Sequence, residues 1–565
     1  MRSSIIYNPG KIQEPEAVSP AFQEDIFLEP ISNLLDKYKD IVTPKITGDI
    51  STIHVDEIAS KLANFYEKIR KIIDWKEDNL LIRSAIQRIL KRNLIAEISV
   101  IKFIFNNKPD NLSESLISEL IRGGHLKNDQ IPRSKIPLVE KIINKYLVFL
   151  KNASSDTLFA GKNKINFFNW IMEIAACEIE DTLSPPRKEN ILIEAMTILV
   201  NDRAKSIPSD FISDQDKMAQ TYIAVHRTLF HLDDAIISYR LIKLKYPNWL
   251  QPSADELNDY SSKLFQIWNE MKNELNSNVS KQFFNICENV DTVFTLIGDV
   301  LDNFQKDPDQ LIQTFSQKDK FREIIIENYN KRIKTLKKRL FKISAFSTLS
   351  VLVGNLAMYF FVEVPLAIFL YERISFFAMI VDILLPSVFM FSLVSIIRPP
   401  SKTNLESVIE LTNSFVYKKE NRRIYEIKPT KKSKPLTLFL IMILYLIAGL
   451  VFFGFIGKMF LISGLPITSV VLNTLMIAIN VFAALAIRNK ARELTVEDKG
   501  TLWEFLLDII SIPVAQVGSW FAQKWKEYNI ISVFFNAFIE MPFITVVSFV
   551  EEWSTFLKEK KGNIH

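Results

Sequence analysis

The sequence predicts an all-α membrane protein, and three observations carry that prediction. Four long apolar blocks lie between residues 343 and 487, helical periodicity runs through the residues before them, and lysine and arginine gather beside the blocks. We expect a large cytoplasmic helical domain, then four transmembrane helices in two hairpins, then an amphipathic helical tail at the membrane interface.

The composition supports a membrane protein in a reducing compartment. The chain has 565 residues, of which 48% are hydrophobic, and its mean hydropathy is +0.11. Cys177 and Cys287 form no CxxC pattern, which argues against a disulfide framework or a structural zinc. The net charge of +5 predicts no nucleic-acid partner, because the basic residues lie beside the apolar blocks.

Residues 21–330 are expected to form the cytoplasmic helical domain, after an aperiodic arm at residues 1–20. Apolar residues recur every three or four positions, as in residues 55–75 and 112–122. Prolines at positions 185, 186 and 247 interrupt the pattern. No segment shows sustained period-two alternation bounded by turns, so we predict no sheet.

The transmembrane domain is expected at residues 331–490. An α-helix needs about 20 apolar residues to cross about 30 Å of hydrocarbon. The four spans are predicted at residues 343–362, 374–397, 435–457 and 466–487. A helix of a soluble bundle usually keeps one polar face, which makes four buried soluble helices the weaker alternative.

Basic residues predict the orientation of these spans, because lysine and arginine beside a span resist transfer across the membrane. They flank the first span, fill the loop at residues 398–434 and follow the fourth span. Both termini are therefore expected in the cytoplasm. The residues predicted to meet anionic lipid headgroups are Lys337, Lys338, Arg339, Arg422, Arg423, Lys431 and Lys432.

Asp382 is the one charged residue within the four predicted spans, so it is the first candidate for a functional site. An ionised carboxylate in the membrane is costly, and such residues are partnered, protonated or turned to an aqueous path. Asn355, Asn473 and Asn480 are candidate polar neighbours from other spans. The alternative is interhelical hydrogen bonding that fixes the bundle, which a lone carboxylate favours.

The other motifs and groups of polar residues in the sequence give no reason to predict a catalytic residue, a cofactor or a metal site. Phosphate-binding, dinucleotide-binding, nucleophile-elbow and zinc-protease motifs are absent from the sequence. His226 and His231 are five residues apart and do not share a helix face. Glu173, Glu178 and Glu180 lack the histidine partners of a di-metal bundle and are expected to be surface charges.

Residues 491–565 are expected to lie at the membrane surface. Tryptophans at positions 503, 520, 525 and 553 are typical of the headgroup layer. Residues 530–550 are long enough to span, but Glu540 and Pro542 interrupt them. The segment therefore reads as amphipathic helices in the inner leaflet.

Three phrases carry a resemblance to other proteins: residues 75–94 (WKEDNLLIRSAIQRILKRNL), 120–129 (LIRGGHLKND) and 524–543 (KWKEYNIISVFFNAFIEMPF). They resemble a group of uncharacterised multi-span membrane proteins from candidate-phylum bacteria with reduced genomes. The resemblance implies a bacterial inner membrane, and it implies no activity and no functional residues.

The function expected from these features is that of a membrane-anchored interaction or scaffold protein of the cytoplasmic membrane. Its partners would be anionic lipid headgroups, a protein bound to the cytoplasmic domain and, as one option, further copies of itself. The alternatives are an ion- or proton-coupled channel or transporter that uses Asp382, and an enzyme acting on a lipid-linked substrate.

Overall fold

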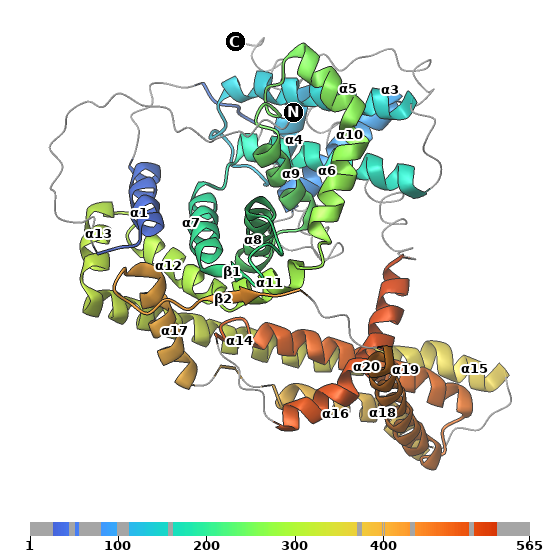
Figure 1. Ribbon diagram of the computed structural model, residues 1–565. Helices are drawn as coiled ribbons and strands as arrows, with labels where there is room; N and C mark the ends of the chain where they lie inside the picture. Colours follow the sequence, from blue (N-terminus) through green and yellow to red (C-terminus); the bar gives the residue numbers. More distant parts are fainter. Residues whose placement is uncertain are drawn as a thin grey trace, which may run out of the picture.

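The computed structural model confirms the all-α fold class (Figure 1). The residues that the structure describes are 26–43, 51–55, 81–98, 112–155, 162–369, 376–397, 399–400, 402–429, 435–496 and 502–527. The expected arm at residues 1–20 and the interrupted span at residues 530–550 lie outside them. Two hydrophobic cores fill the N-terminal helical region, and a third lies among the membrane helices.

The first core belongs to the N-terminal helical region alone. Its buried side chains come mainly from six helices. These are α3 (Leu81–Ile98), α4 (Leu112–Arg122), α5 (Ile136–Ser155), α6 (Lys162–Leu183), α9 (Asp234–Lys245) and α10 (Ala254–Leu275), with a 3₁₀ turn at Arg133–Lys135 before α5. Ser253 caps α10 in a capping box with Glu256, which satisfies backbone N–H groups at the start of that helix.

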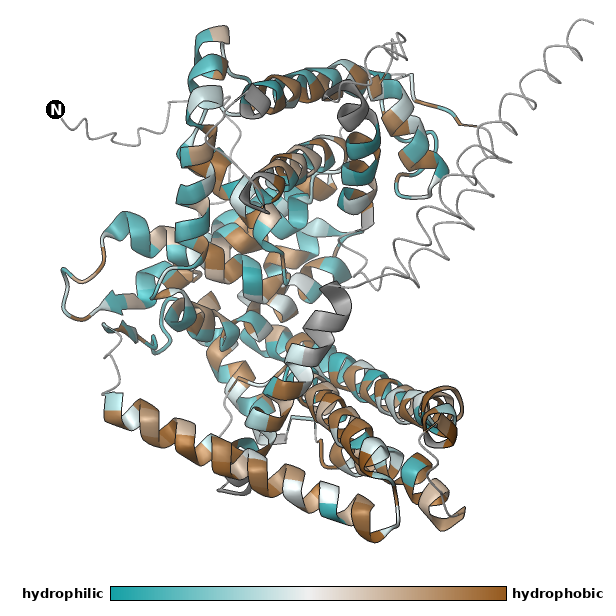
Figure 2. Ribbon diagram, turned by 90° about the vertical axis from the view of Figure 1, so that its right-hand side faces the viewer, coloured by the Kyte–Doolittle hydropathy of each residue, from teal (hydrophilic) through white to brown (hydrophobic). Residues whose placement is uncertain are grey.

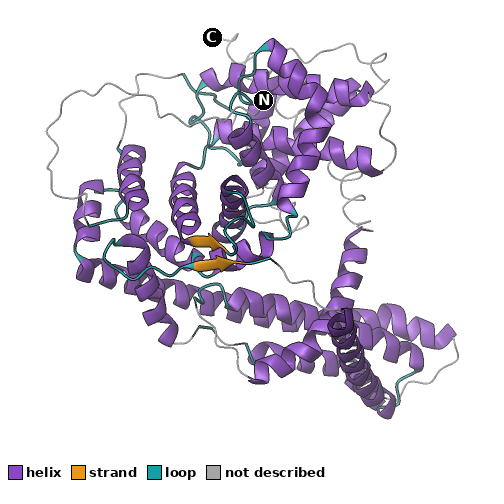
Figure 3. Cartoon of the chain, in the orientation of Figure 1, coloured by secondary structure: helices purple, strands orange, loops and turns teal. Residues whose placement is uncertain are grey.

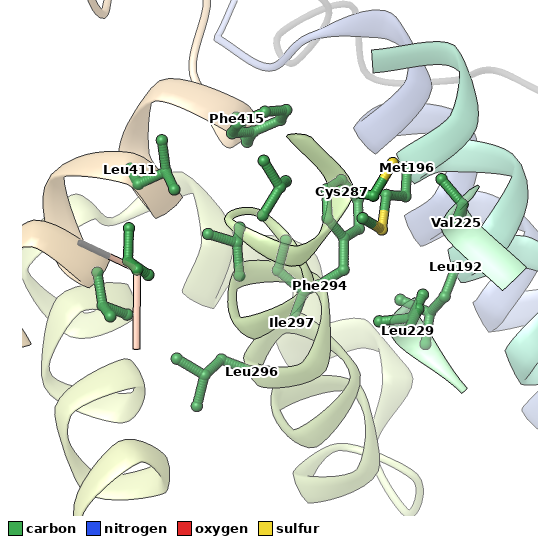
Figure 4. Packing of buried hydrophobic residues seen from close by; sticks show 14 of the residues in the cluster. Leu192, Met196, Val225, Leu229, Cys287, Phe294, Leu296, Ile297, Leu411 and Phe415 are labelled. Carbon is green, nitrogen blue, oxygen red and sulfur yellow. The ribbon is translucent and has the colours of Figure 1, made fainter. Parts of the chain in front are cut away.

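The second core joins the N-terminal helical region to later parts of the chain. It is built on α1 (Glu29–Val42), α7 (Arg187–Arg203), α8 (Asp214–Leu229), α11 (Ser280–Glu288), α12 (Asp291–Asn303) and α13 (Pro308–Ser316). It also takes in α17 (Lys402–Val416), whose Leu411 and Phe415 pack near Phe294 of α12 (Figure 4). Val408, Leu411 and Phe415 are buried at helical spacing, so α17 turns one apolar face to this core.

A short sheet completes this joint core and corrects the expectation of no sheet (Figure 3). Strand β1 (Ala204–Ser206) pairs in parallel with β2 (Tyr425–Ile427), with Ala204 opposite Tyr425. Residues 398–434 were expected to be a basic loop beside the membrane. Their described part instead supplies a helix and a strand to the core, because its apolar side chains are buried there.

Four described helices are long and apolar enough to cross a membrane. This confirms the prediction of four spans as far as length and composition decide it. The first is continuous from α14 (Lys318–Met358) through a π-helical turn (Tyr359–Glu363) into α15 (Val364–Phe369). The others are α16 (Phe376–Ser395), α18 (Pro435–Ile462) and α19 (Ile467–Ala491). Their apolar side chains face outwards, and these helices form the brown part at the bottom of Figure 2.

We call the ends of these helices that join the N-terminal helical region the near ends, and the opposite ends the far ends. Helix α14 begins in the joint core, where Phe321 and Ile325 are buried, and runs on to the far end (Figure 1). Met390 and Val394 of α16 and Ile487 of α19 belong to the same cluster. The membrane helices and the N-terminal helical region therefore share one core.

Helix α20 (Leu502–Glu527) differs from the expected surface tail. Arg488 near the end of α19 forms an ion pair with Asp508, and Gly518 lies against the backbone of Ala478, near the middle of α19. The two contacts show that α20 runs antiparallel to α19. Val514 and Ala515 are buried in the core of the membrane helices, and that burial accounts for the position.

Candidate functional site

Two acidic residues and an amide meet between three membrane helices. The side-chain nitrogen Nδ2 of Asn473 lies 3.2 Å from Glu363 Oε1 and 3.1 Å from the backbone oxygen of Ser469. The same nitrogen donates to Asp382 Oδ1. The Asn473 amide therefore bridges the two carboxyl groups, and Oε2 of Glu363 is buried without a hydrogen-bond partner among the described residues. We call Glu363, Asp382 and Asn473 the carboxyl cluster.

The carboxyl cluster is closed off from solvent by the surrounding helices. Glu363 and Asp382 are each 2% exposed and Asn473 is 4% exposed. The described residues form no ion pair with either acid within 4.0 Å. The two carboxyl groups accept from one amide nitrogen, and two unneutralised like charges held this close together are unfavourable in an apolar setting.

All three residues lie at one depth, in the far half of the membrane helices. Glu363 lies six residues before Phe369, Asp382 six after Phe376 and Asn473 six after Ile467. At a rise of 1.5 Å per residue, that distance is about 9 Å of helix. The equal spacing explains why three separate helices bring these side chains together.

Glu363 was not predicted as a site residue, because the first predicted span ends at residue 362 and Glu363 falls in the turn that follows it. The helix instead continues to Phe369, and its π-helical turn ends at Glu363. A π-helical turn inserts an extra residue and is frequent at functional sites. The apolar residues after Glu363, beginning Val-Pro-Leu-Ala-Ile-Phe, were the signal that the span goes on.

The other predicted polar residues form a second layer, closer to the middle of the membrane helices. Asn355 Nδ2 lies 3.4 Å from the backbone oxygen of Ile383, and Ser387 Oγ lies 3.3 Å from the same oxygen. Asn480 lies seven residues after Asn473 and therefore on the same face of α19. Its Nδ2 is buried without a described hydrogen-bond partner.

The predicted headgroup residues separate into different roles. Lys337 and Lys338 are exposed, whereas Arg339 forms an ion pair with Glu493. Arg422 lies 3.7 Å from a carboxylate oxygen of Asp202, and Arg423 also interacts within the protein. Lys431 and Lys432 lie outside the described residues.

The acidic residues of α6 are not all surface charges, which corrects that expectation for Glu178. Its carboxylate is buried and accepts hydrogen bonds from Lys145 Nζ at 2.6 Å and Tyr146 OH at 2.8 Å. Glu173 and Glu180 are half-buried. Burial raises the pKa of Glu180 to about 7, although Arg83 acts in the opposite direction. The pair of Lys145 and Glu178 links α5 to α6 inside the first core.

The two histidines of α8 and its C-terminal turn lie in different environments. His226 is fully buried, its Nδ1 lies 2.7 Å from the backbone oxygen of Tyr222, and burial lowers the pKa of its imidazole to about 3. His231 is exposed. In the part of the chain that the structure describes, no group of three or more histidine, cysteine, aspartate or glutamate residues is placed to hold a metal.

Comparisons with known proteins identify no relative. No family model matches the sequence, and neither the curated proteins nor the solved structures contain a match.

Proposed function

We propose that this protein is a proton-coupled membrane protein in which Glu363 and Asp382 hold one proton between them. The observation that supports it is that two buried carboxyl groups accept from one amide donor, with no described cation within reach. Intramembrane acids of this kind are typical of proton relays and ion paths. A lone Asp382 had favoured a purely structural role, and the second carboxyl removes that argument.

The distribution of polar groups suggests how the cluster would take part in coupling. Asn355 and Asn480 continue the polar residues towards the middle of the membrane helices, but Met390, Val394 and Ile487 beyond them are apolar and buried. A proton that reaches the cluster would need a rearrangement of the helices to continue. Helix α14 joins Glu363 to the joint core through one continuous helix, so it is the natural element to transmit such a movement.

Proton flux into proteoliposomes tests this function. We expect a pH gradient to collapse faster with the wild-type protein than without protein, and both Asp382→Asn and Glu363→Gln to remove that difference. Asp214→Asn, which neutralises an exposed acid in the N-terminal helical region, should behave as the wild type. Size-exclusion profiles confirm that each variant is folded. A folded wild-type protein with no flux above the protein-free background contradicts the proposal.

The orientation is also a proposal. Basic residues beside the near ends favour a cytoplasmic position for the N-terminal helical region, in the cytoplasmic membrane of a bacterium. Cysteine labelling checks it. An impermeant reagent added to intact cells should label Lys458→Cys at the far end and not Lys334→Cys. Cys177 and Cys287 are buried, so they add little background. The reverse labelling pattern would invert the orientation.

The position of the C-terminus depends on residues outside the described part of the chain. Because α20 runs antiparallel to α19, a cytoplasmic C-terminus requires residues 528–565 to return towards the near side. A tag after His565 that external protease removes from intact cells would place the C-terminus outside.

A second candidate is the scaffold function, and one observation favours it. The joint core fixes the N-terminal helical region against the membrane helices, which would hold a partner-binding surface at a constant position. Co-purification from native membrane tests this candidate. A scaffold retains its partners in the Asp382→Asn variant, whereas a proton-coupled protein loses flux in that variant.

A further inference from the structure

A groove runs between α14 and α16 at their near ends. It measures about 760 Å³ and has a mainly apolar lining. Leu340, Ser387, Val394 and Ile487 are buried lining residues, whereas Phe341 and Phe391 are exposed on its rims. Since this part of the protein lies among the membrane helices, the groove opens towards lipid rather than towards water.

The two ends of the groove differ in chemistry. Lys337 lines its near end, and Leu352 and Leu384 line its deeper part. From Ile343, the first residue of the uncharged stretch, α14 descends nine residues to Leu352. Nine residues of helix measure about 14 Å, and one leaflet of hydrocarbon is about 15 Å thick. The groove therefore has the length of one acyl chain with a cation at its headgroup end.

From Arg332 to Arg339, the cations of α14 divide between two faces of the helix. Arg332 and Arg339, seven residues apart, turn to the N-terminal helical region and pair with Asp299 and Glu493. Lys334, Lys337 and Lys338 share the face that continues into the groove, and all three are exposed. None of these lysines pairs with an acid among the described residues. Their positive charge is left for an external anion.

We infer that this groove binds one phospholipid with an anionic headgroup, with an acyl chain between α14 and α16 and its phosphate beside Lys334, Lys337 and Lys338. The apolar lining recognises the chain, and the lysines select the charge of the headgroup. The inference is independent of the proton-coupled function, because the groove residues are not members of the carboxyl cluster.

Native mass spectrometry of the purified protein in detergent tests the inference by titration with phosphatidylglycerol and with phosphatidylcholine. We expect the first phosphatidylglycerol to bind more tightly than phosphatidylcholine. Lys334→Gln and Lys337→Gln should each raise the dissociation constant for phosphatidylglycerol about fivefold. This factor corresponds to the loss of about 1 kcal/mol for each lysine near a headgroup. Lys458→Gln, at the far end of α18, is the control for charge.

A groove-filling variant tests the chain-binding part separately. Ala345 lines the groove, so Ala345→Trp should weaken the binding of both lipids. Val451→Phe, on the exposed face of α18, should weaken the binding of neither lipid. Equal affinity for the two lipids, unchanged by the lysine variants, would overturn the inference. So would equally tight binding of the water-soluble glycerophosphoglycerol headgroup, which would indicate a phosphate site without a chain. The lysine variants alter exposed positions, so the test survives if Ala345→Trp does not fold.

Discussion

The guanidinium carbon of Arg203 lies 3.5 Å from the centroid of the Phe415 ring. Arg203 also donates from Nη1 to Ser414 Oγ at 3.2 Å, and both Arg203 and Phe415 are buried. The two residues come from the end of α7 and the end of α17, and β1 follows Arg203 directly. This contact closes the joint core with residues that lie after two membrane helices in the chain.

The N-terminal helical region should therefore be incomplete without α17 and β2. A fragment of residues 26–342 should melt without a cooperative transition, because apolar side chains that pack against α17 are left exposed. A synthetic peptide of residues 402–429 should bind this fragment and restore a cooperative melt, as measured by calorimetry and circular dichroism. The same peptide with Phe415→Ala is the control and should bind far more weakly. A fragment that melts cooperatively without the peptide would show that the region is independent.

Gly518 should be required for the contact between α20 and α19. A Cβ at Gly518 would collide with the backbone oxygen of Ala478 and lie 3.0 Å from the nitrogen of Ile479. Gly518→Ala should therefore lower the melting temperature in detergent, at a cost of about 1–3 kcal/mol for overpacking. Gly454→Ala is the matched control, because a Cβ there meets nothing within 4 Å. Equal melting temperatures for the two variants would argue against this packing of α20.

Asp291 should make stability depend on pH. Burial raises the pKa of its carboxyl to about 8 from the ordinary 3.8, and the nearby Glu288 and Glu493 act in the same direction. Between these pH values the folded protein holds a proton that the unfolded chain has lost, so stability falls as pH rises through this window. Asp291→Asn should flatten this part of the pH profile and stabilise the protein at pH 8 by roughly 1–3 kcal/mol. Chemical denaturation at several pH values measures the free energy of unfolding of both proteins. If its dependence on pH is the same in Asp291→Asn as in the wild type, the assignment is contradicted.

Lys145 should be essential to the first core because its ammonium neutralises a buried acid. Lys145→Met leaves Glu178 without its cation and should destabilise the protein by about 3–5 kcal/mol. Adding Glu178→Gln should recover part of the loss, because the amide oxygen still accepts from Tyr146 OH. Chemical denaturation of both variants gives the comparison. If the double variant is as unstable as Lys145→Met alone, packing rather than charge accounts for the loss.

The membrane helices were predictable from sequence, because a helix apolar on every face over about 20 residues has few other locations. Two of the three residues of the carboxyl cluster could be predicted from the sequence. Asp382 and Asn473 stand out within apolar blocks, whereas Glu363 was taken as the boundary of a block. A charged residue usually marks the end of a span, but here the amide of Asn473 at the same depth donates a hydrogen bond to Glu363 within the membrane helices.

The joint core could not be predicted from the sequence as the membrane helices could, although the sequence of α17 alone contains part of the evidence for it. The spacing of Val408, Leu411 and Phe415 marks an amphipathic helix that could have been recognised within the supposed loop. The pairing of β1 with β2 has no such local signal, because each strand is three residues long and the partners are separated by more than 200 residues. The position of α20 was missed because an amphipathic, tryptophan-rich sequence resembles a surface helix, and its burial depends on Gly518 and its neighbours.

The pairing of β1 with β2 also imposes an order on biosynthesis. After Ser316 has been translated, a further 111 residues must be made before Ile427 is available, and two membrane helices must be inserted in between. At 5–20 residues per second, this interval lasts roughly 6–22 s. For that time the nascent chain exposes the apolar surface that α17 will cover. Ribosome-bound chains stopped at residue 400 should be cut by protease within residues 26–316, whereas chains stopped at residue 480 should resist. The cell thus completes the first-made part of this protein only after its membrane anchor is in place.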